Sequence, residues 1–275
     1  MKVITIPSTF LLCFALLSSC ASSQKTVQTN KTPGALVIYD SNELFTNRDF
    51  WNMSTDNGDL IIIGVGGVKI SRAETIKGAV EDAARQASLF NQVRANFEYS
   101  ERISGELLGY FVDKQQKIDF DEDHQKHIGS LKYDPETDVL ITNNAAFVRT
   151  RWTPPTSFHI SYTPDSRERP SWTINQPSTI GGMITGVGYS SHLMYHHAYV
   201  ASYESAIYSI AIRVDGNVKA GKVNYEGEGL LDYSDVSETK IVASAQLNGF
   251  YILQIWVDPE TNGVYTLAVA QQASK

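Results

Sequence analysis

The chain has 275 residues, of which 42% are hydrophobic, enough for one large core or two modest ones. Its formal net charge is −7, and lysine and arginine form no long run, so we exclude nucleic acid as a partner held by a basic surface.

The N-terminus has the pattern of an export signal. Lys2 supplies a positive start, and the apolar run at residues 10–17 is too short to span a bilayer. The signal ends in Leu17-Ser-Ser-Cys20-Ala21, which resembles the lipobox of bacterial lipoproteins, where cleavage precedes a cysteine that carries a diacylglycerol. The resemblance implies that Cys20 is the acylated first residue, and that Ala21, which is not aspartate, directs the protein to the outer membrane. A soluble secreted protein with an incidental cysteine is the alternative.

The cysteine content agrees with this anchor. Cys13 lies in the predicted signal peptide, residues 1–19, so Cys20 is the one cysteine left after cleavage and cannot form an internal disulfide. Residues 20–34 are polar and lack apolar periodicity, which predicts a flexible tether. As a coil of about 14 residues it would hold the folded part on the order of 20 Å from the bilayer.

The first predicted domain, residues 35–165, begins with strands. Residues 35–39 are expected to form a short strand, and residues 60–65 are a continuous apolar run, typical of a strand covered on both faces. Ser71-Arg-Ala-Glu74 has the spacing of a capping box and predicts the start of a helix. Apolar residues then recur at three- and four-residue steps up to Phe90, which predicts one buried helix face.

After Phe97 the sequence is polar, and we expect irregular structure there. Asp119-Phe-Asp121-Glu-Asp123 resembles part of a calcium loop, but His124 stands where glycine is needed and Ser130 where a glutamate should bind. We therefore expect a solvated acidic loop, with calcium binding as the alternative. Further strands are predicted at residues 139–142, 146–152 and 158–162.

The second predicted domain, residues 166–275, follows a polar, proline-containing boundary at residues 163–169. A helix is expected from about residue 191 to residue 214. A three-strand meander then follows at residues 241–247, 250–257 and 264–269. Asn248-Gly249 is predicted to be the first turn of this meander.

A glycine motif precedes each helix, as Gly64-Val-Gly66 and as Gly186-Val-Gly188. In a gapless alignment of the two copies, small residues of the helices coincide, namely Ala79, Ala83 and Ala87 with Ala201, Ser205 and Ser209. We interpret this as an internal duplication in which small residues let each helix approach a sheet closely. The predicted fold class is α+β, with two tandem similar domains, each a long helix packed on an antiparallel β-sheet.

The second helix carries two patterns that could form sites. A row of tyrosines recurs at four-residue spacing, Tyr195, Tyr199 and Tyr203. We expect this row to cover a domain interface rather than to bind a flat ligand. His192 and His196 are one helical turn apart with His197 adjacent, so two imidazoles could face one metal ion. Because no carboxylate or cysteine stands at the third ligand spacing, a surface histidine cluster is our interpretation and a metal site the alternative.

The remaining motifs do not indicate catalysis. A Rossmann loop needs a third glycine where Lys69 and Ser191 stand, and Glu74 would occupy the helix end that a phosphate needs. The sequence contains no Gly-x-Ser-x-Gly elbow for a serine nucleophile. We therefore predict that the protein is not an enzyme and uses no cofactor.

Several short motifs together resemble one protein family. They are Pro170-Ser-Trp172, Gly186-Val-Gly188, the small residues of the second helix, and Ile255-Trp256 before Val264-Tyr-Thr-Leu-Ala268. They resemble the twenty-kilodalton bacterial lipoprotein family, which is similar to the N-terminal domain of flagellar assembly protein T. The resemblance covers residues 170–270 and, more weakly, residues 50–162. It implies an α+β outer-membrane lipoprotein, linked in some members to flagella or the cell surface, and brings no catalytic residues.

The sequence thus predicts a lipid-anchored bacterial envelope protein with a non-catalytic binding or structural role. Its expected partners are the outer membrane, through lipidated Cys20, and envelope or flagellar proteins, on the periplasmic or the outer side. The alternative is a periplasmic metal-dependent binder or envelope enzyme that uses the region of His192 and His196.

Overall fold

The computed structural model describes residues 38–39, 50–53, 58–104, 109–120, 123–223 and 236–273. Residues 36–275 form one compact unit, which does not include residues 1–35. The predicted signal peptide, Cys20 and the predicted tether therefore lie outside the described residues. In the part of the chain that the structure describes, no helix is both long and apolar enough to cross a membrane.

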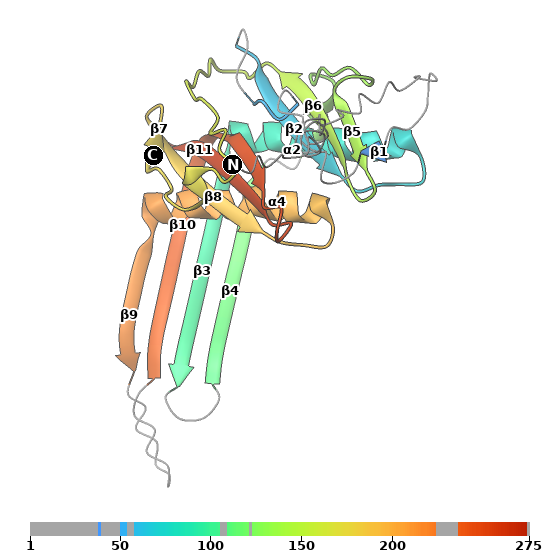
Figure 1. Ribbon diagram of the computed structural model, residues 1–275. Helices are drawn as coiled ribbons and strands as arrows, with labels where there is room; N and C mark the ends of the chain where they lie inside the picture. Colours follow the sequence, from blue (N-terminus) through green and yellow to red (C-terminus); the bar gives the residue numbers. More distant parts are fainter. Residues whose placement is uncertain are drawn as a thin grey trace, which may run out of the picture. The chain divides into compact units, whose positions relative to one another are not determined.

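Two β-sheets carry an α+β fold (Figure 1). Among the described residues, the smaller sheet has four strands in the order β1 (Ile38–Tyr39), β5 (Val139–Thr142), β6 (Ala146–Trp152) and β2 (Leu60–Gly66). The larger has seven, in the order β4 (Gly109–Phe120), β3 (Val93–Ser104), β10 (Val236–Val257), β11 (Val264–Gln272), β8 (Met183–Ser190) and β7 (Thr179–Ile180), with β9 (Asn217–Val223) also paired to β10. All pairs are antiparallel except β1 with β5.

Each long helix packs on the strand that precedes it. Helix α2 (Arg72–Asn91) lies on β2 and β6, and α4 (Tyr195–Asp215) lies on β8, β11 and β10. Two short helices, α3 (Gln125–Ile128) and the 3-10 helix η1 (Ser171–Thr173), complete the described helical structure. The predicted start of α2 is confirmed, because Ser71 Oγ accepts a hydrogen bond from the Glu74 amide at 3.2 Å.

Glycine lets α2 approach its sheet closely. A side chain on Gly64 would overlap the Ala79 carbonyl oxygen and would lie 2.6 Å from the Ala83 amide nitrogen. One on Gly66 would lie 2.6 Å from the Ala79 amide nitrogen. The predicted packing role of the glycine motif is therefore confirmed, because only a residue without Cβ fits there.

The gapless alignment of the two copies is wrong. Gly188, rather than Gly186, takes the place of Gly64, because its side chain would overlap the Ser202 carbonyl and the Ala206 amide. The row of α4 against the sheet is fully buried and consists of Ala198, Ser202 and Ala206. The residues that the alignment predicted are only half-buried, namely Ala201, Ser205 and Ser209. Because side chains of a strand repeat every two residues, a Gly-x-Gly motif can be aligned with either glycine of the other copy. Only the contacts with the helix decide which glycines are equivalent.

The two halves do not form separate sheets, as tandem domains would. Strand β3 of the first half pairs with β10 of the second along its whole length, from Val93 opposite Leu247 to Ser104 opposite Val236. Strand β9 pairs with the other edge of the same part of β10. Long hairpins from both halves therefore form one continuous sheet (Figure 1).

The predicted boundary at residues 163–169 is fastened to the larger sheet. The side chain of Gln254 on β10 accepts hydrogen bonds from the Asp165 amide and the Trp172 indole, both at 3.0 Å, and from the Tyr162 hydroxyl. It donates to the Asp165 carbonyl at 2.8 Å. These bonds hold the segment within the compact unit of residues 36–275.

Three local predictions are wrong. Residues 98–120, which we expected to be irregular, lie mostly in β3 and β4. Apolar and polar residues alternate from Val93 to Tyr99, which is the pattern of a strand. Asn248-Gly249 is a register shift inside the single strand β10, where Gly249 takes a φ of 66°, rather than a hairpin turn. Residues 158–162 form no strand, although Ile160 is buried.

Candidate functional site

Both strand-to-helix loops present an aliphatic side chain to solvent. The loop between β2 and α2 is residues 67–71, and the loop between β8 and α4 is residues 191–194. Ile70 is fully exposed and Leu193 is 95% exposed, and each stands two residues before the first residue of its helix. Val68 and Met194 are partly exposed beside them. Both strand-to-helix loops therefore expose an aliphatic residue at the same distance from the start of the helix.

Local hydrogen bonds fix the backbone around each exposed residue. The Lys69 amide donates to Thr75 Oγ1 at 2.9 Å, on one side of Ile70, and the helix cap at Ser71 follows on the other side. In the second loop the Met194 amide donates to His192 Nδ1 at 3.1 Å, which bridges Leu193. The outward position of Ile70 and of Leu193 thus follows from the loop conformation.

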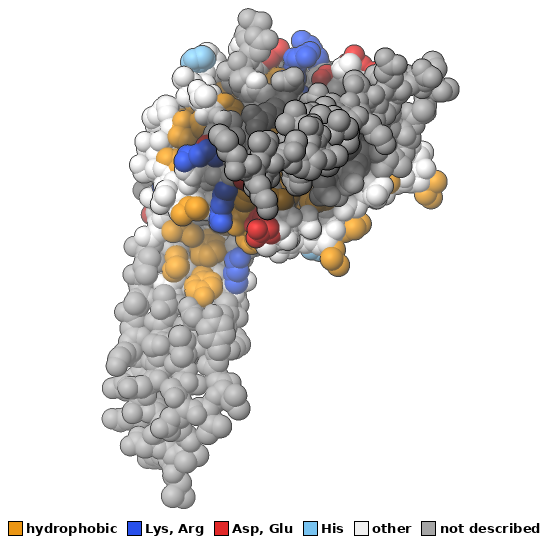
Figure 2. Space-filling view, viewed as in Figure 1, with side chains coloured by type: hydrophobic (Ala, Val, Ile, Leu, Met, Phe, Trp, Pro, Cys, Tyr) orange, Lys and Arg blue, Asp and Glu red, His pale blue; other side chains and the backbone are white. Residues whose placement is uncertain are grey.

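The two loops meet at the start of α4. A side chain on Gly67 would lie 3.1 Å from the His196 ring, and the backbone of Asn144, in the turn between β5 and β6, interacts with that ring. We call residues 67–71 and 191–194 together the loop surface. Figure 2 shows hydrophobic side chains projecting along the edge where these loops lie in Figure 1.

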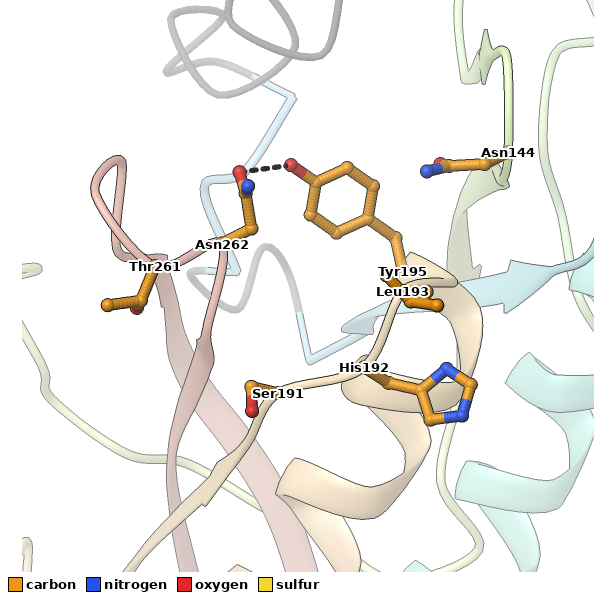
Figure 3. Close-up of a pocket in the computed structure, with 7 residues that line it drawn as sticks. All are labelled: Asn144, Ser191, His192, Leu193, Tyr195, Thr261 and Asn262. Atoms are coloured by element: carbon orange, nitrogen blue, oxygen red, sulfur yellow. Dashed lines mark hydrogen bonds between the residues drawn. The ribbon is translucent and has the colours of Figure 1, made fainter.

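A hollow of about 600 Å³ adjoins the second loop (Figure 3). It is lined by Asn144, Ser191, His192, Leu193, Tyr195, Thr261 and Asn262. The Tyr195 hydroxyl donates to Asn262 Oδ1 at 3.0 Å across one wall. Asn144 comes from the first half, and Thr261 and Asn262 come from the turn between β10 and β11. A molecule in the hollow would therefore contact both halves, mainly through amide and hydroxyl groups.

The predicted surface histidine cluster is confirmed, but the predicted helical spacing of His192 and His196 is wrong. Helix α4 begins at Tyr195, so His192 lies in the preceding loop and is not one helical turn from His196. The ring of His197 contacts both, at centroid distances of 4.0 Å to His196 and 4.9 Å to His192. Within the described residues, no group of three or more His, Cys, Asp or Glu side chains is placed to hold a metal ion.

The protonation of His196 also follows from this packing. Burial lowers the pKa of His196 below its usual value, and the neighbouring His197 acts in the same direction. The Asn144 backbone opposes the shift. The imidazole is therefore neutral near pH 7 and packs between the first loop and the turn between β5 and β6.

Two further predicted sites lie wholly or partly beyond the described residues. Cys20 is one, so its lipidation stays a prediction. The acidic loop is the other, because its residues 121–122 are not described. In its described part, the Asp119 carboxylate forms an ion pair with Lys117 Nζ at 2.9 Å. Calcium binding by that loop stays untested.

The tyrosine row of α4 contacts the first half, as predicted for an interface. The Tyr199 hydroxyl donates to the Ile63 carbonyl of β2 at 2.7 Å, and the Tyr203 hydroxyl donates to Asp82 Oδ1 of α2 at 2.7 Å. Both tyrosines are fully buried. Tyr199 and Tyr203 therefore join the two halves and are not available to a ligand, whereas Tyr195 borders the hollow.

Asp82 is the centre of a buried polar network between the helices. Its Oδ2 accepts hydrogen bonds from the Val65 amide at 3.0 Å and from Gln86 Nε2 at 2.9 Å. Arg85 donates to the Tyr203 hydroxyl and, at 2.6 Å, to Glu204 of α4. Burial raises the pKa of Asp82, although these donors and Arg85 oppose the shift. Because its groups bond one another, we interpret the network as structural.

No family model, curated protein or solved structure matches this chain. The resemblance to the twenty-kilodalton lipoprotein family therefore rests on the sequence motifs alone.

Sequence reasoning missed the loop surface, although a signal was present. Lys69-Ile70-Ser71 and His192-Leu193-Met194 each place an aliphatic residue directly before a helix start, in a stretch without helical or strand periodicity. The hollow had no such signal, because its lining comes from three segments far apart in the sequence.

Proposed function

We propose that the chain is a lipid-anchored protein of the bacterial cell envelope with a non-catalytic binding role, exerted through the loop surface. The observation that carries the binding role is the outward position of Ile70 and Leu193. Burying an aliphatic side chain is worth about 1.5 to 3 kcal/mol, so two such side chains held in water favour association with a partner.

The anchor and its location are supported by the sequence. The export pattern of residues 1–19 and the lipobox ending at Cys20 support acylation, and Ala21 supports the outer membrane. The family resemblance supports envelope or flagellar proteins as further partners. The two halves are proposed to be related copies of a strand–helix–hairpin unit whose long hairpins now share one sheet.

The anchor is tested by metabolic labelling with a fatty acid. Cys20→Ala is expected to abolish labelling of the protein, whereas Cys13→Ala, a matched change inside the predicted signal, should retain it. Undiminished labelling of the Cys20→Ala variant would show that the lipid is not on this residue.

The binding role is tested by photo-crosslinking in the cell. A photoreactive residue at position 193 is expected to capture a lipid or protein partner, and one at position 174 serves as the control. Ile174 is 67% exposed but lies outside the loop surface. Equal capture at both positions, or none at position 193, would remove the loop surface as the binding site.

A further inference from the structure

We infer that the loop surface rests in the interfacial layer of the phospholipid bilayer, with Ile70 and Leu193 inserted among the lipids. This inference rests on the proposed anchoring and names the partner of the loop surface. It makes the lipid of Cys20 and the two loops separate points of attachment to the same membrane.

The place where the chain enters the compact unit supports this orientation. Strand β1 pairs with β5 so that Ile38 lies opposite Ile141 and Tyr39 opposite Thr142. The Thr142 hydroxyl accepts a hydrogen bond from the Ala145 amide at 3.0 Å, so β5 leads directly into the turn that contacts His196. At about 3.3 Å per strand residue, the entry point lies on the order of 10 Å from that turn.

The length of the chain before β1 allows both attachments at once. The predicted tether, residues 20–34, would span on the order of 20 Å as a coil. Because the chain enters beside the loop surface, a bilayer that holds the lipid of Cys20 lies within reach of that surface. An entry point at the far end of the sheets would have left the loops facing away from the anchor.

The chemistry of the loops fits a lipid interface better than a protein surface. Ile70 and Leu193 project furthest, and each has polar neighbours, Lys69 and Ser71 in one loop and His192 in the other, which can remain at the level of the headgroups. A stable protein interface commonly covers about 800 Å² on each partner with a continuous apolar centre. Two separate projecting side chains do not provide such a centre.

Charge contributes little to this attachment. Lys69 lies in the first loop and Arg72 begins α2, but Glu74 follows in the first turn of that helix. Asp258 and Glu260 lie in the turn that borders the hollow. Since the charges nearly cancel, apolar insertion dominates. We therefore expect binding that depends only weakly on salt and on the share of anionic lipid.

The first test reads the surroundings of the loops directly. In a full chain with Cys13→Ala and Cys20→Ala, an environment-sensitive fluorophore is attached to Ile70→Cys, to Leu193→Cys or to the control Ile174→Cys. With phosphatidylethanolamine and phosphatidylglycerol vesicles, we expect at least a twofold rise in fluorescence and a blue shift at positions 70 and 193, and no change at 174. Unchanged emission at 70 and 193, or an equal change at 174, would overturn the inference.

The second test measures binding by flotation with the same vesicles. In the cysteine-free chain, Ile70→Asp with Leu193→Asp should weaken binding on the order of 100-fold, about tenfold for each side chain, whereas Ile174→Asp should not. All variants share the apolar residues 10–17, and an unchanged urea midpoint shows that the double variant is folded. If the double variant binds the vesicles as tightly as the cysteine-free chain, or if residue 193 crosslinks only to a protein in the cell, the bilayer is not the partner. Fatty-acid labelling of Cys20 is independent of both results.

Discussion

Helices α2 and α4 approach their sheets through the same device. Gly64 lies beneath the Ala79 carbonyl, and Gly188 lies beneath the Ser202 carbonyl, with no room for a side chain at either position. The helices differ in the polar groups at their contact. Helix α2 contributes the carboxylate of Asp82, and α4 contributes tyrosines, of which Tyr203 donates its hydroxyl hydrogen bond to that carboxylate. Clearance for the helix backbone is therefore required on both sheets, whereas the polar groups specify how the two helices pack together.

The largest expected effect tests the close approach of each helix to its sheet over a glycine. Gly64→Ala and Gly188→Ala should each lower the free energy of unfolding by about 3 kcal/mol, because the new methyl group meets helix backbone that cannot move aside. Urea unfolding followed by circular dichroism would measure both. Similar losses are expected, since the two glycines take equivalent places.

The control for these variants lies on α2 itself. A side chain on Gly78 would come no closer than 4.0 Å to Gly66 Cα, which is ordinary contact. Gly78→Ala should therefore stabilise the protein by about 0.5 to 1 kcal/mol, through helix propensity. A loss of stability as large as that of Gly64→Ala would show that steric clearance is not the reason for the glycine motif.

The second prediction concerns the tyrosines that join the two helices. Tyr203→Phe should cost about 2 kcal/mol, because it takes a donor from the buried carboxylate of Asp82 and an acceptor from Arg85. Tyr199→Phe should cost about 1 kcal/mol, since the Ile63 carbonyl keeps the hydrogen bond from Gln86 Nε2 at 2.8 Å. Urea unfolding of both variants measures the difference, and equal losses would contradict the assigned role of the network.

The third prediction uses the raised pKa of Asp82. Because its pKa is higher in the folded than in the unfolded state, the folded protein binds the proton more tightly, and stability falls as pH rises from about 4 through the folded pKa. Asp82→Asn removes this titration. Compared with that variant, the natural protein should lose free energy of unfolding as pH rises from 4 to 8. A difference that stays constant over this range would mean that the carboxyl is not perturbed by burial.

The sequence predicted those parts of the fold that depend on local patterns. The bounds of β5 and β6 agree with the prediction, and so does the helix start at Ser71, since a capping box and short apolar runs carry their own signals. The sheet that joins the halves was not predicted, because the pairing of Val93 with Leu247 is set by packing between distant segments. The assumption of two tandem domains followed from reading the repeats separately.

The candidate site was less predictable than the fold. The pairing of His192 with His196 assumed a helix that begins at residue 191, whereas the chain turns through the His192–Met194 hydrogen bond and enters α4 at Tyr195. The exposure of Leu193 depends on that same turn. Single residues before a helix look alike in sequence whether they point into a core or away from it, so their function emerges only from the loop geometry.

The smallest expected effect concerns the helix caps, which differ between the two units. Ser71 caps α2, but the cap position of α4 is Met194, which has extended backbone angles and makes no side-chain cap hydrogen bond. Ser71→Ala should cost about 1 kcal/mol, and Met194→Ser should gain about 0.5 kcal/mol by supplying the missing acceptor. Thermal and urea unfolding would measure both changes.

The missing cap also bears on the role of the loop surface. Met194 is partly exposed beside Leu193, so Met194→Ser should weaken vesicle flotation severalfold while it stabilises the fold. Opposite changes in stability and binding are expected where a residue serves a surface at the expense of its helix. If Met194→Ser raises stability and leaves flotation unchanged, Met194 does not belong to the inserted part of the loop surface. If stability does not rise, the first amides of α4 already have acceptors, and the contrast with α2 is not one of capping.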